Sequence, residues 1–376
     1  MERGLAPVSP QEAYLFRAIG NFFSRLFGWI LAPFAAIGRW YTRRGWILRV
    51  SVAAFFVLFV GLNAYFMVQT QVWSGFNPDY VAAYDFENRD TSAGAPLANV
   101  GENAARTCSP SAIAQVTADL IDFNVDQNAW ISSMLFYKLG FFGIDWDRTP
   151  FFDNKASFQR GVNQAVRRTA VEFVDTLGRV RGTSQIDSDL QKARENIQFS
   201  EDAWYFGLNP FGPKTPTPSF YRTAAKALRS FNTRLERCDA VFDARADNLM
   251  QFLDRIAGDI GSTSAILRER SENHNGGWFD FRADDRFWFA YGQLYGYYGL
   301  LHAARADFRD VIAQRSLHTI WDDTEQQFRS ALNIRPFIIS NGKEAGWIMP
   351  THLATMGFYI LRARSNLVEL RQVLDR

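Results

Sequence analysis

Three aspartates among aromatic residues form the stretch of the sequence most suggestive of chemistry. They are Asp280, Asp284 and Asp285, within GGWFDFRADDRFWFAYGQLYGYY, which also holds Trp278, Trp288, Tyr291 and Tyr295. Glycoside hydrolysis requires one protonated and one ionised carboxylate, and aromatic rings stack on sugars, so the stretch suggests a peptidoglycan- or glycan-acting enzyme. The alternative is structural: acidic residues favour the first turn of a helix, and the aromatic residues then belong to the core. We favour this structural interpretation.

Other catalytic signatures are not found in the sequence. The four histidines, His274, His302, His318 and His352, are scattered, without an H-E-x-x-H motif or a close cysteine pair, so we expect no metal site. The sequence has no Walker A motif, no G-x-S-x-G and no G-x-G-x-x-G after a predicted strand. We therefore expect no cofactor and a non-catalytic role.

A long apolar segment near the N-terminus determines where the rest of the chain lies relative to a membrane. Residues 50–68, VSVAAFFVLFVGLNAYFMV, carry no charge, and nineteen helical residues extend roughly 28 Å, close to the thickness of the hydrocarbon layer of a bilayer. A buried core helix would show a polar face, and a cleavable signal would have a shorter apolar run and a small-residue cleavage site. The sequence therefore predicts one permanent transmembrane helix at 50–68.

The charges around this segment predict its orientation. Arg39, Arg43, Arg44 and Arg49 precede it, whereas the first basic residue after it is Arg89. By the positive-inside rule the N-terminus is cytoplasmic and the C-terminal part is translocated.

The residues before the span form a basic amphipathic tail. Residues 1–49 contain seven Arg and two Glu, and Ser9, Pro10 and Glu12 are typical of a helix N-terminus. A cytoplasmic helix resting on anionic headgroups is expected, and the alternatives are a helix packed on a partner's membrane domain and a hairpin entering the bilayer. The residues expected at the membrane interface are Leu15, Ile19, Phe22, Leu26, Ile30, Arg39, Arg43, Arg44 and Arg49.

Composition limits the partners and the compartment. After the tail, 34 basic and 37 acidic residues remain, without a basic stripe, so no nucleic acid is expected as a partner. The two cysteines, Cys108 and Cys238, both lie on the translocated side, where they form either a disulfide or two buried thiols. The absence of any N-x-[ST] sequon favours a bacterial periplasm over a eukaryotic lumen.

Helical periodicity dominates the translocated part. We predict helices at 109–123, 129–139, 153–180, 184–199, 220–260, 284–313, 317–332 and 351–374, with a short hairpin near Asn341 and Gly342. The helix at 220–260 has near-heptad apolar spacing with one skipped turn. Long helices with short connections usually lie antiparallel, so the predicted fold class is all-α: an N-terminal amphipathic helix, one transmembrane helix and a long-helix bundle outside the membrane.

Three glycines mark a close helix contact. Gly292, Gly296 and Gly299 share one face of the helix predicted at 284–313, and small residues at this spacing let another helix approach closely. A second membrane span is the alternative, but charged residues leave only a short apolar stretch there, which includes Gln293 and His302.

These observations combine into a domain organisation. We predict a cytoplasmic amphipathic basic tail (1–49), a transmembrane helix (50–68), a linker (69–107), a helical periplasmic subdomain (108–206), a Pro/Gly linker (207–219) and a long-helix bundle subdomain (220–376). The expected function is that of a scaffold or accessory subunit of an envelope or membrane complex, in contact with the lipid bilayer and with other membrane or envelope proteins, including other copies of the chain. The alternatives are the glycan-acting enzyme described above and a periplasmic lipid-binding module.

The layout also resembles a known family. An arginine-bearing N-terminal helix, one span and a helical region with RADDRFWFAYGQLYGYYGLL near its middle resemble an uncharacterised proteobacterial family of inner-membrane proteins, catalogued as a domain of unknown function. The resemblance implies a location in the inner membrane and no particular chemistry.

Overall fold

Two long helices form the N-terminal part of the chain, α1 (Pro10–Thr42) and α2 (Trp46–Gln71). The computed structural model describes residues 10–97, 106–140, 144–145, 148–149, 151–179, 185–208, 210–343, 346 and 348–376. By their contacts these residues separate into two units, Met1–Tyr65 and Phe66–Arg376.

In the first unit, α1 begins at Pro10, while Ser9 lies outside the described residues. The side chains of Leu15, Ile19, Leu26 and Ile30 also lie outside the described part of the structure. The other residues expected at the membrane interface, Phe22, Arg39, Arg43, Arg44 and Arg49, are all exposed.

Helix α2 contains the whole predicted span. Among the described residues it is the one helix long and apolar enough to cross a membrane, and none of its most apolar stretch is buried. Its length and composition are therefore compatible with a membrane span.

The second unit is an all-α bundle with one short hairpin. Its elements are the 3-10 turn η1 (Tyr80–Ala83), the helices α3 (Ala112–Asp122), α4 (Leu135–Leu139), α5 (Asn154–Glu172), α6 (Ser188–Ile197), α7 (Thr217–Glu236), α8 (Ala246–Asn273), α9 (Ala283–Asp307), α10 (Arg309–Gln314), α11 (His318–Leu332) and α12 (His352–Leu374), and the strands β1 (Phe206–Leu208) and β2 (Phe211–Pro213).

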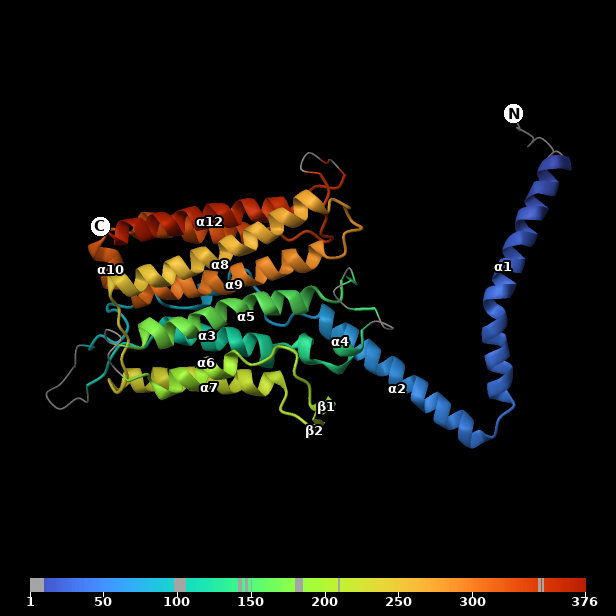
Figure 1. Ribbon diagram of the computed structural model, residues 1–376, viewed down its shortest axis with the longest axis horizontal. Helices are drawn as coiled ribbons and strands as arrows, with labels where there is room; N and C mark the ends of the chain where they lie inside the picture. The colour runs from blue at the N-terminus through green and yellow to red at the C-terminus, as the bar shows by residue number, and fades with distance from the viewer. Residues whose placement is uncertain are drawn as a thin grey trace, which may run out of the picture. The chain divides into compact units, whose positions relative to one another are not determined.

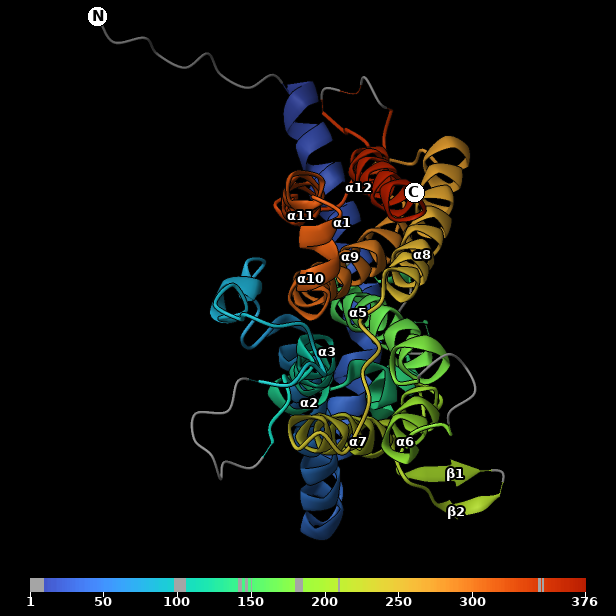
Figure 2. The ribbon, with the colours of Figure 1, turned by 90° about the vertical axis from the view of Figure 1, so that its left-hand side faces the viewer.

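The long helices run along one axis in layers. Helices α8, α11 and α12 lie on one side of the central pair α5 and α9, and α3, α6 and α7 lie on the other side (Figures 1 and 2). Most residues of α9 are buried because helices on both sides cover it, whereas His302 and Arg305 are partly exposed. One continuous hydrophobic core joins the layers.

Close backbone contact between α5 and α9 depends on glycines from both helices. A methyl group at Gly292 would overlap the carbonyl oxygen of Phe158, and one at Gly161 would overlap the carbonyl oxygen of Phe289. Gly296 faces Ala165, and Gly299 faces the ring of Tyr80. The glycine face of α9 therefore packs inside the bundle.

Four connections lie together at one end of the bundle, where α2 ends (Figure 1). They are the described residues of the segments 140–153, 198–216, 274–282 and 333–351. A bridge from Gly277 to Asn341 joins the last two, and a bridge from Asn341 to Thr351 lies within the last one. Lys138, in α4 just before the first connection, pairs with Asp202 of the second at 3.2 Å. We call this the anchor end.

The long helix predicted at 220–260 is wrong. The chain leaves helical geometry between α7 and α8, because Cys238 has a left-handed backbone (φ 60°) and is bonded to Cys108. Phe242, in the connecting segment, is still buried in the core, which explains why the apolar spacing continues through the break.

Other predicted helices have shifted or divided ends. The N-cap of α3 is Ser111 rather than Ser109, the helix predicted at 129–139 is a 3-10 turn (Ile131–Ser133) followed by α4, and the helix predicted at 284–313 is interrupted at Phe308 between α9 and α10. At the break between α9 and α10, the buried side chain of Phe308 continues the apolar spacing.

The segments predicted as linkers are also structured. Of residues 69–107, those described are largely packed along the bundle: Val81 and Phe86 are buried, and the Tyr80 hydroxyl donates to the Tyr295 carbonyl at 2.9 Å. The segment 207–219 contains most of the β1–β2 hairpin, and α6 and α7 on either side of it pack against each other within the same unit.

Candidate functional sites

The three aspartates lie in different environments. Asp280 is buried and accepts hydrogen bonds from Arg270 and from Asn341 Nδ2, the latter at 2.8 Å. Burial would raise the pKa of Asp280, but these hydrogen bonds and the charge of Arg270 outweigh burial and hold the pKa below its usual value. Asp280 thus fastens the 274–282 connection to α8 and to Asn341.

Asp284 and Asp285 begin α9 but face different surroundings. Asp284 is 5% exposed, and burial, with a smaller contribution from the charge of Asp285, raises its pKa to about 8. Asp285 accepts a 2.7 Å hydrogen bond from Ser157 of α5 and lines a cavity of about 230 Å³. Asp280 and Asp284 do not line that cavity, so the structure does not bring the three carboxylates together around one substrate.

The aromatic residues next to the aspartates are also dispersed. Tyr291 and Tyr295 are fully buried, and the Tyr291 hydroxyl donates to the Leu332 carbonyl at 2.6 Å. Trp278 is exposed, whereas Trp288 lines an apolar cavity at the anchor end. These rings do not form one stacking platform for a sugar.

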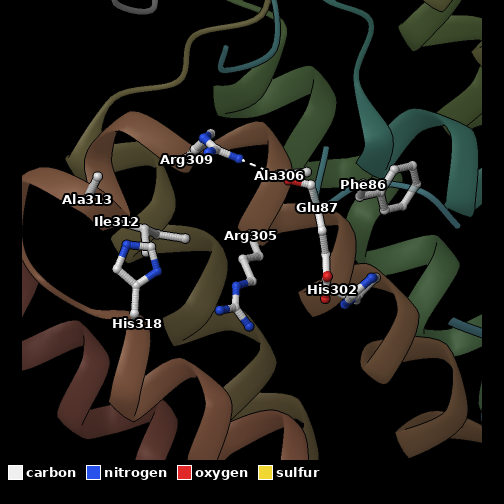
Figure 3. A pocket seen from close by; sticks show the side chains of 9 residues that line it. All are labelled: Phe86, Glu87, His302, Arg305, Ala306, Arg309, Ile312, Ala313 and His318. Carbon is white, nitrogen blue, oxygen red and sulfur yellow. Dashed lines mark hydrogen bonds between the residues drawn. The ribbon is translucent and has the colours of Figure 1, made fainter. Parts of the chain in front are cut away.

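A charged groove lies on the side of the bundle formed by α9, α10 and α11 (Figure 3). It comprises two adjoining hollows of about 350 and 440 Å³ that share Glu87 and His302. The residues that define it are Phe86, Glu87, Tyr298, His302, Arg305, Arg309, His318, Glu325 and Arg329. We call it the α9–α11 groove.

The charged side chains of the α9–α11 groove are held in fixed positions. His302 Nδ1 lies 3.3 Å from Glu325 Oε1, and Arg329 lies 3.1 Å both from Asp79 Oδ1 and from the Tyr298 hydroxyl. Figure 3 shows Arg309 donating to the Glu87 carbonyl, at 3.3 Å. Paired charges around a concave surface with aromatic rings are suited to binding a polar partner.

The groove could not be found from sequence spacing. Asp79 and Arg329 are far apart in the chain, and the packing of the 79–89 segment on α9 is what brings them together. The only sequence signal was the spacing of His302 and Arg305 on one predicted helix.

A second polar cluster lies between α5, α8 and α9. Asp259 of α8 accepts hydrogen bonds from Gln164 at 3.0 Å, from Gln293 at 2.6 Å and from the Tyr297 hydroxyl at 2.8 Å. Burial is the main reason that the pKa of Tyr297 is far above its usual value. This cluster holds the central helices in register, because the largely covered carboxylate of Asp259, with its side chain 8% exposed, needs these donors.

The end of α2 is fastened to the bundle by polar side chains. The buried ammonium of Lys155, in the first turn of α5, donates to the carbonyls of Gln69 at 3.0 Å and Val72 at 2.6 Å. Burial lowers the pKa of Lys155 to about 8. Lys155 therefore places a cation at a free carbonyl group in the last turn of α2. Gln71, at the end of the same helix, donates to the Phe151 carbonyl at 3.0 Å and ties α2 to the connection before α5.

Cys108 and Cys238 are joined in a disulfide, with 5.3 Å between their Cα atoms. The Cys108 amide also donates to the Glu236 carbonyl at 2.9 Å, so the segment before α3 is fixed to the end of α7 by two links. Among the described residues, no group of three or more His, Cys, Asp or Glu side chains is arranged to hold a metal ion.

Comparison with known proteins places the bundle in a family. A family model described as an uncharacterized protein conserved in bacteria (DUF2333) matches residues 97–276 and 267–376. The chain belongs to this family. The DUF2333 match extends from the segment before α3 to the end of the chain, and it leaves α1 and α2 outside. It confirms the resemblance to an uncharacterised bacterial family. Neither a curated protein nor a solved structure matches the chain significantly.

Proposed function

We propose that this protein is a single-span protein of the bacterial inner membrane whose periplasmic bundle serves as a non-catalytic scaffold or accessory subunit of an envelope or membrane complex. The observation that carries the scaffold role is the α9–α11 groove. Ion pairs position Arg305 and Arg329, and a hydrogen bond to the Glu87 carbonyl positions Arg309, before any partner binds. Arginine and aromatic side chains are enriched at protein interfaces. The proteobacterial origin suggested by the sequence layout belongs to the same proposal.

The membrane location is supported by α2 and by the charges around it. Four exposed arginines precede the apolar segment, and the first basic residue after it is Arg89. A disulfide between Cys108 and Cys238 requires an oxidising compartment such as the periplasm. Both observations favour a cytoplasmic N-terminus.

Orientation is tested with a reporter enzyme that is active only after export. Fused after Arg376 the reporter should be active, and fused after Thr42, at the end of α1, it should be inactive. Activity of the C-terminal fusion in the cytosol alone would refute the proposed location.

The scaffold role is tested by affinity purification of the tagged full-length protein in mild detergent. Arg309→Glu reverses a charge that lines the groove, and Arg268→Glu reverses an exposed charge on α8 as a matched control. We expect the same membrane or envelope proteins to co-purify with wild type and Arg268→Glu and to be lost from Arg309→Glu, with unchanged thermal stability. The proposal is contradicted if both variants recover the same co-purifying proteins in equal amounts. It is also contradicted if wild type and both variants purify as a lone monomer.

A lipid-binding role is the second candidate, supported by an apolar cavity at the anchor end. This cavity, of about 610 Å³, is lined by the rings of Trp73, Phe76, Trp288 and Phe337 and by Arg335. An aromatic cavity with one cation suits an anionic amphiphile. Native mass spectrometry of the purified protein should then show bound lipid in wild type and less in Trp288→Ala, and lipid-free protein in both excludes this role.

A further inference from the structure

Exposed apolar side chains are concentrated at the anchor end. Phe337 is 93%, Phe211 79% and Phe279 76% exposed. Among the described residues of α4, β1, β2 and the four anchor-end connections, the exposed large apolar residues are Leu139, Ile144, Phe151, Tyr205, Phe206, Phe211, Trp278, Phe279, Phe281, Phe337, Ile338 and Ile348.

The opposite end of the bundle has a different surface. Among its described connections, Leu97 and Val241 are the exposed large apolar residues, and neither is aromatic. Both ends are made of loops between the same helices (Figure 1), so the aromatic excess is a property of one end rather than of loops in general.

The packing of the last turns of α2 on the bundle determines how far the anchor end lies from the membrane surface. Phe66 lies inside the apolar segment, yet it is fully buried against Ile131 and Ala156 of the bundle. Helix α2 ends at Gln71, three residues after the apolar segment, or roughly 5 Å along the helix axis. If α2 crosses the bilayer, the residues packed around Phe66 therefore lie level with the membrane surface.

The distribution of the side chains favours lipid over a protein partner. The exposed aromatic residues belong to four separate connections. Of these residues, Phe151 and Phe337 line the apolar cavity, whereas Phe211, Phe279 and the others lie outside it. A stable protein interface needs a contiguous, complementary surface, whereas the membrane interface accepts single aromatic and aliphatic side chains at headgroup level.

We propose that the anchor end of the bundle inserts its aromatic tips into the periplasmic surface of the bilayer that α2 spans. The bundle then has two attachments to the membrane, the covalent one through α2 and an interfacial one through these loops. The second attachment orients the bundle and places the lining of the apolar cavity next to lipid. This inference rests on the proposed membrane anchoring.

The test uses the full-length protein in lipid nanodiscs with a polarity-sensitive fluorophore on single introduced cysteines. The native cysteines are disulfide-bonded and do not label without a reductant. Phe279→Cys, Phe337→Cys and Phe211→Cys report on the anchor end, and Val241→Cys reports on the opposite end. We expect blue-shifted emission and severalfold stronger quenching by nitroxide-labelled lipid at the three anchor-end positions than at position 241.

The other outcomes overturn the inference. Quenching by aqueous iodide, but not by lipid nitroxide, at the anchor-end positions shows that the loops stand in water. Protection from both quenchers shows that another copy of the chain covers them. The proposed orientation is tested separately by the reporter fusions, so an exported C-terminus with water-exposed loops refutes this inference alone.

Discussion

Asp307 shows how one residue connects distant parts of the bundle. It is fully buried at the end of α9 and accepts hydrogen bonds from the Ser111 hydroxyl at 2.6 Å and from the amides of Ala112 at 2.7 Å and Ile113 at 2.9 Å. It therefore satisfies the free amides at the start of α3. Burial raises its pKa to about 6, although these hydrogen bonds oppose the rise.

Asp307→Asn should destabilise the fold. The amide group would place N–H donors against the donors of α3, leaving at least one buried donor unsatisfied at a cost of about 2–3 kcal/mol. Asp310→Asn, at an exposed position three residues later, should change the free energy of unfolding by less than about 0.5 kcal/mol. Denaturant unfolding of both variants in detergent measures the difference, and equal stabilities would show that the hydrogen bonds to Asp307 contribute little.

Asp284 predicts a pH dependence of stability. Because its pKa is about 8 in the folded protein and near 4 in an unfolded chain, the folded state binds a proton that the unfolded state releases. Stability should therefore fall as pH rises between these values, by up to about 1.4 kcal/mol per pH unit. Asp284→Asn removes this contribution, so it should gain stability relative to wild type between pH 5 and pH 8.

Unfolding midpoints at several pH values test this prediction, with Asp310→Asn as the control that keeps the wild-type slope. Parallel profiles for wild type and Asp284→Asn would mean that Asp284 is ionised in the folded protein.

At the scale of elements, the contact between α5 and α9 determines how the two halves of the bundle meet. Gly292→Ala introduces a methyl group against the Phe158 carbonyl, which is backbone and cannot move aside cheaply. We expect a loss of about 1–3 kcal/mol, typical of overpacking. Gly258→Ala, on α8 with open space around it, should instead stabilise by up to about 1 kcal/mol.

Thermal unfolding of the two glycine variants should therefore shift in opposite directions. A Gly292→Ala protein as stable as wild type would show that α5 and α9 separate without cost.

The sequence anticipated the helical elements better than their ends. Apolar spacing identified α5, α9, α11 and α12 because a helix in a bundle buries one face or all faces. It missed the break between α7 and α8, because Phe242 keeps the spacing while the backbone turns at Cys238. Local spacing records which side chains are buried and does not record whether the backbone between them stays helical.

At the scale of the whole molecule, the disulfide closes a loop across most of one half of the bundle. Cys108 and Cys238 are 130 residues apart, and in the chain-entropy model a loop of this length is worth about 5 kcal/mol. The double variant Cys108→Ser, Cys238→Ser should lose a large part of that stability, and a reductant should lower the thermal midpoint of wild type but not of the double variant.

Maleimide labelling checks the same bond in native membranes. Wild-type protein should label only after unfolding and reduction. Labelling after unfolding without a reductant would show two free thiols and would remove the redox argument for a periplasmic location.

The sequence by itself determined the class of the molecule: an apolar helix preceded by arginines, followed by amphipathic helices. These are local properties, since a bilayer or a core selects side chains within one helix. Only the tertiary structure decided which polar groups meet. Asp284 and Asp285 are neighbours in sequence, but successive side chains of a helix point in different directions around its axis. Asp284 is therefore buried, whereas Asp285 accepts a hydrogen bond from Ser157.

The two surfaces to which we assign a role, the anchor end and the α9–α11 groove, also depend on the tertiary structure. The high phenylalanine content was visible in the sequence. That exposed phenylalanines from four connections lie at one end of the bundle depends on which connections the bundle brings together. The α9–α11 groove likewise requires the 79–89 segment to lie against helices more than 200 residues later. Contacts over such separations follow from packing of the whole core, which no local pattern encodes.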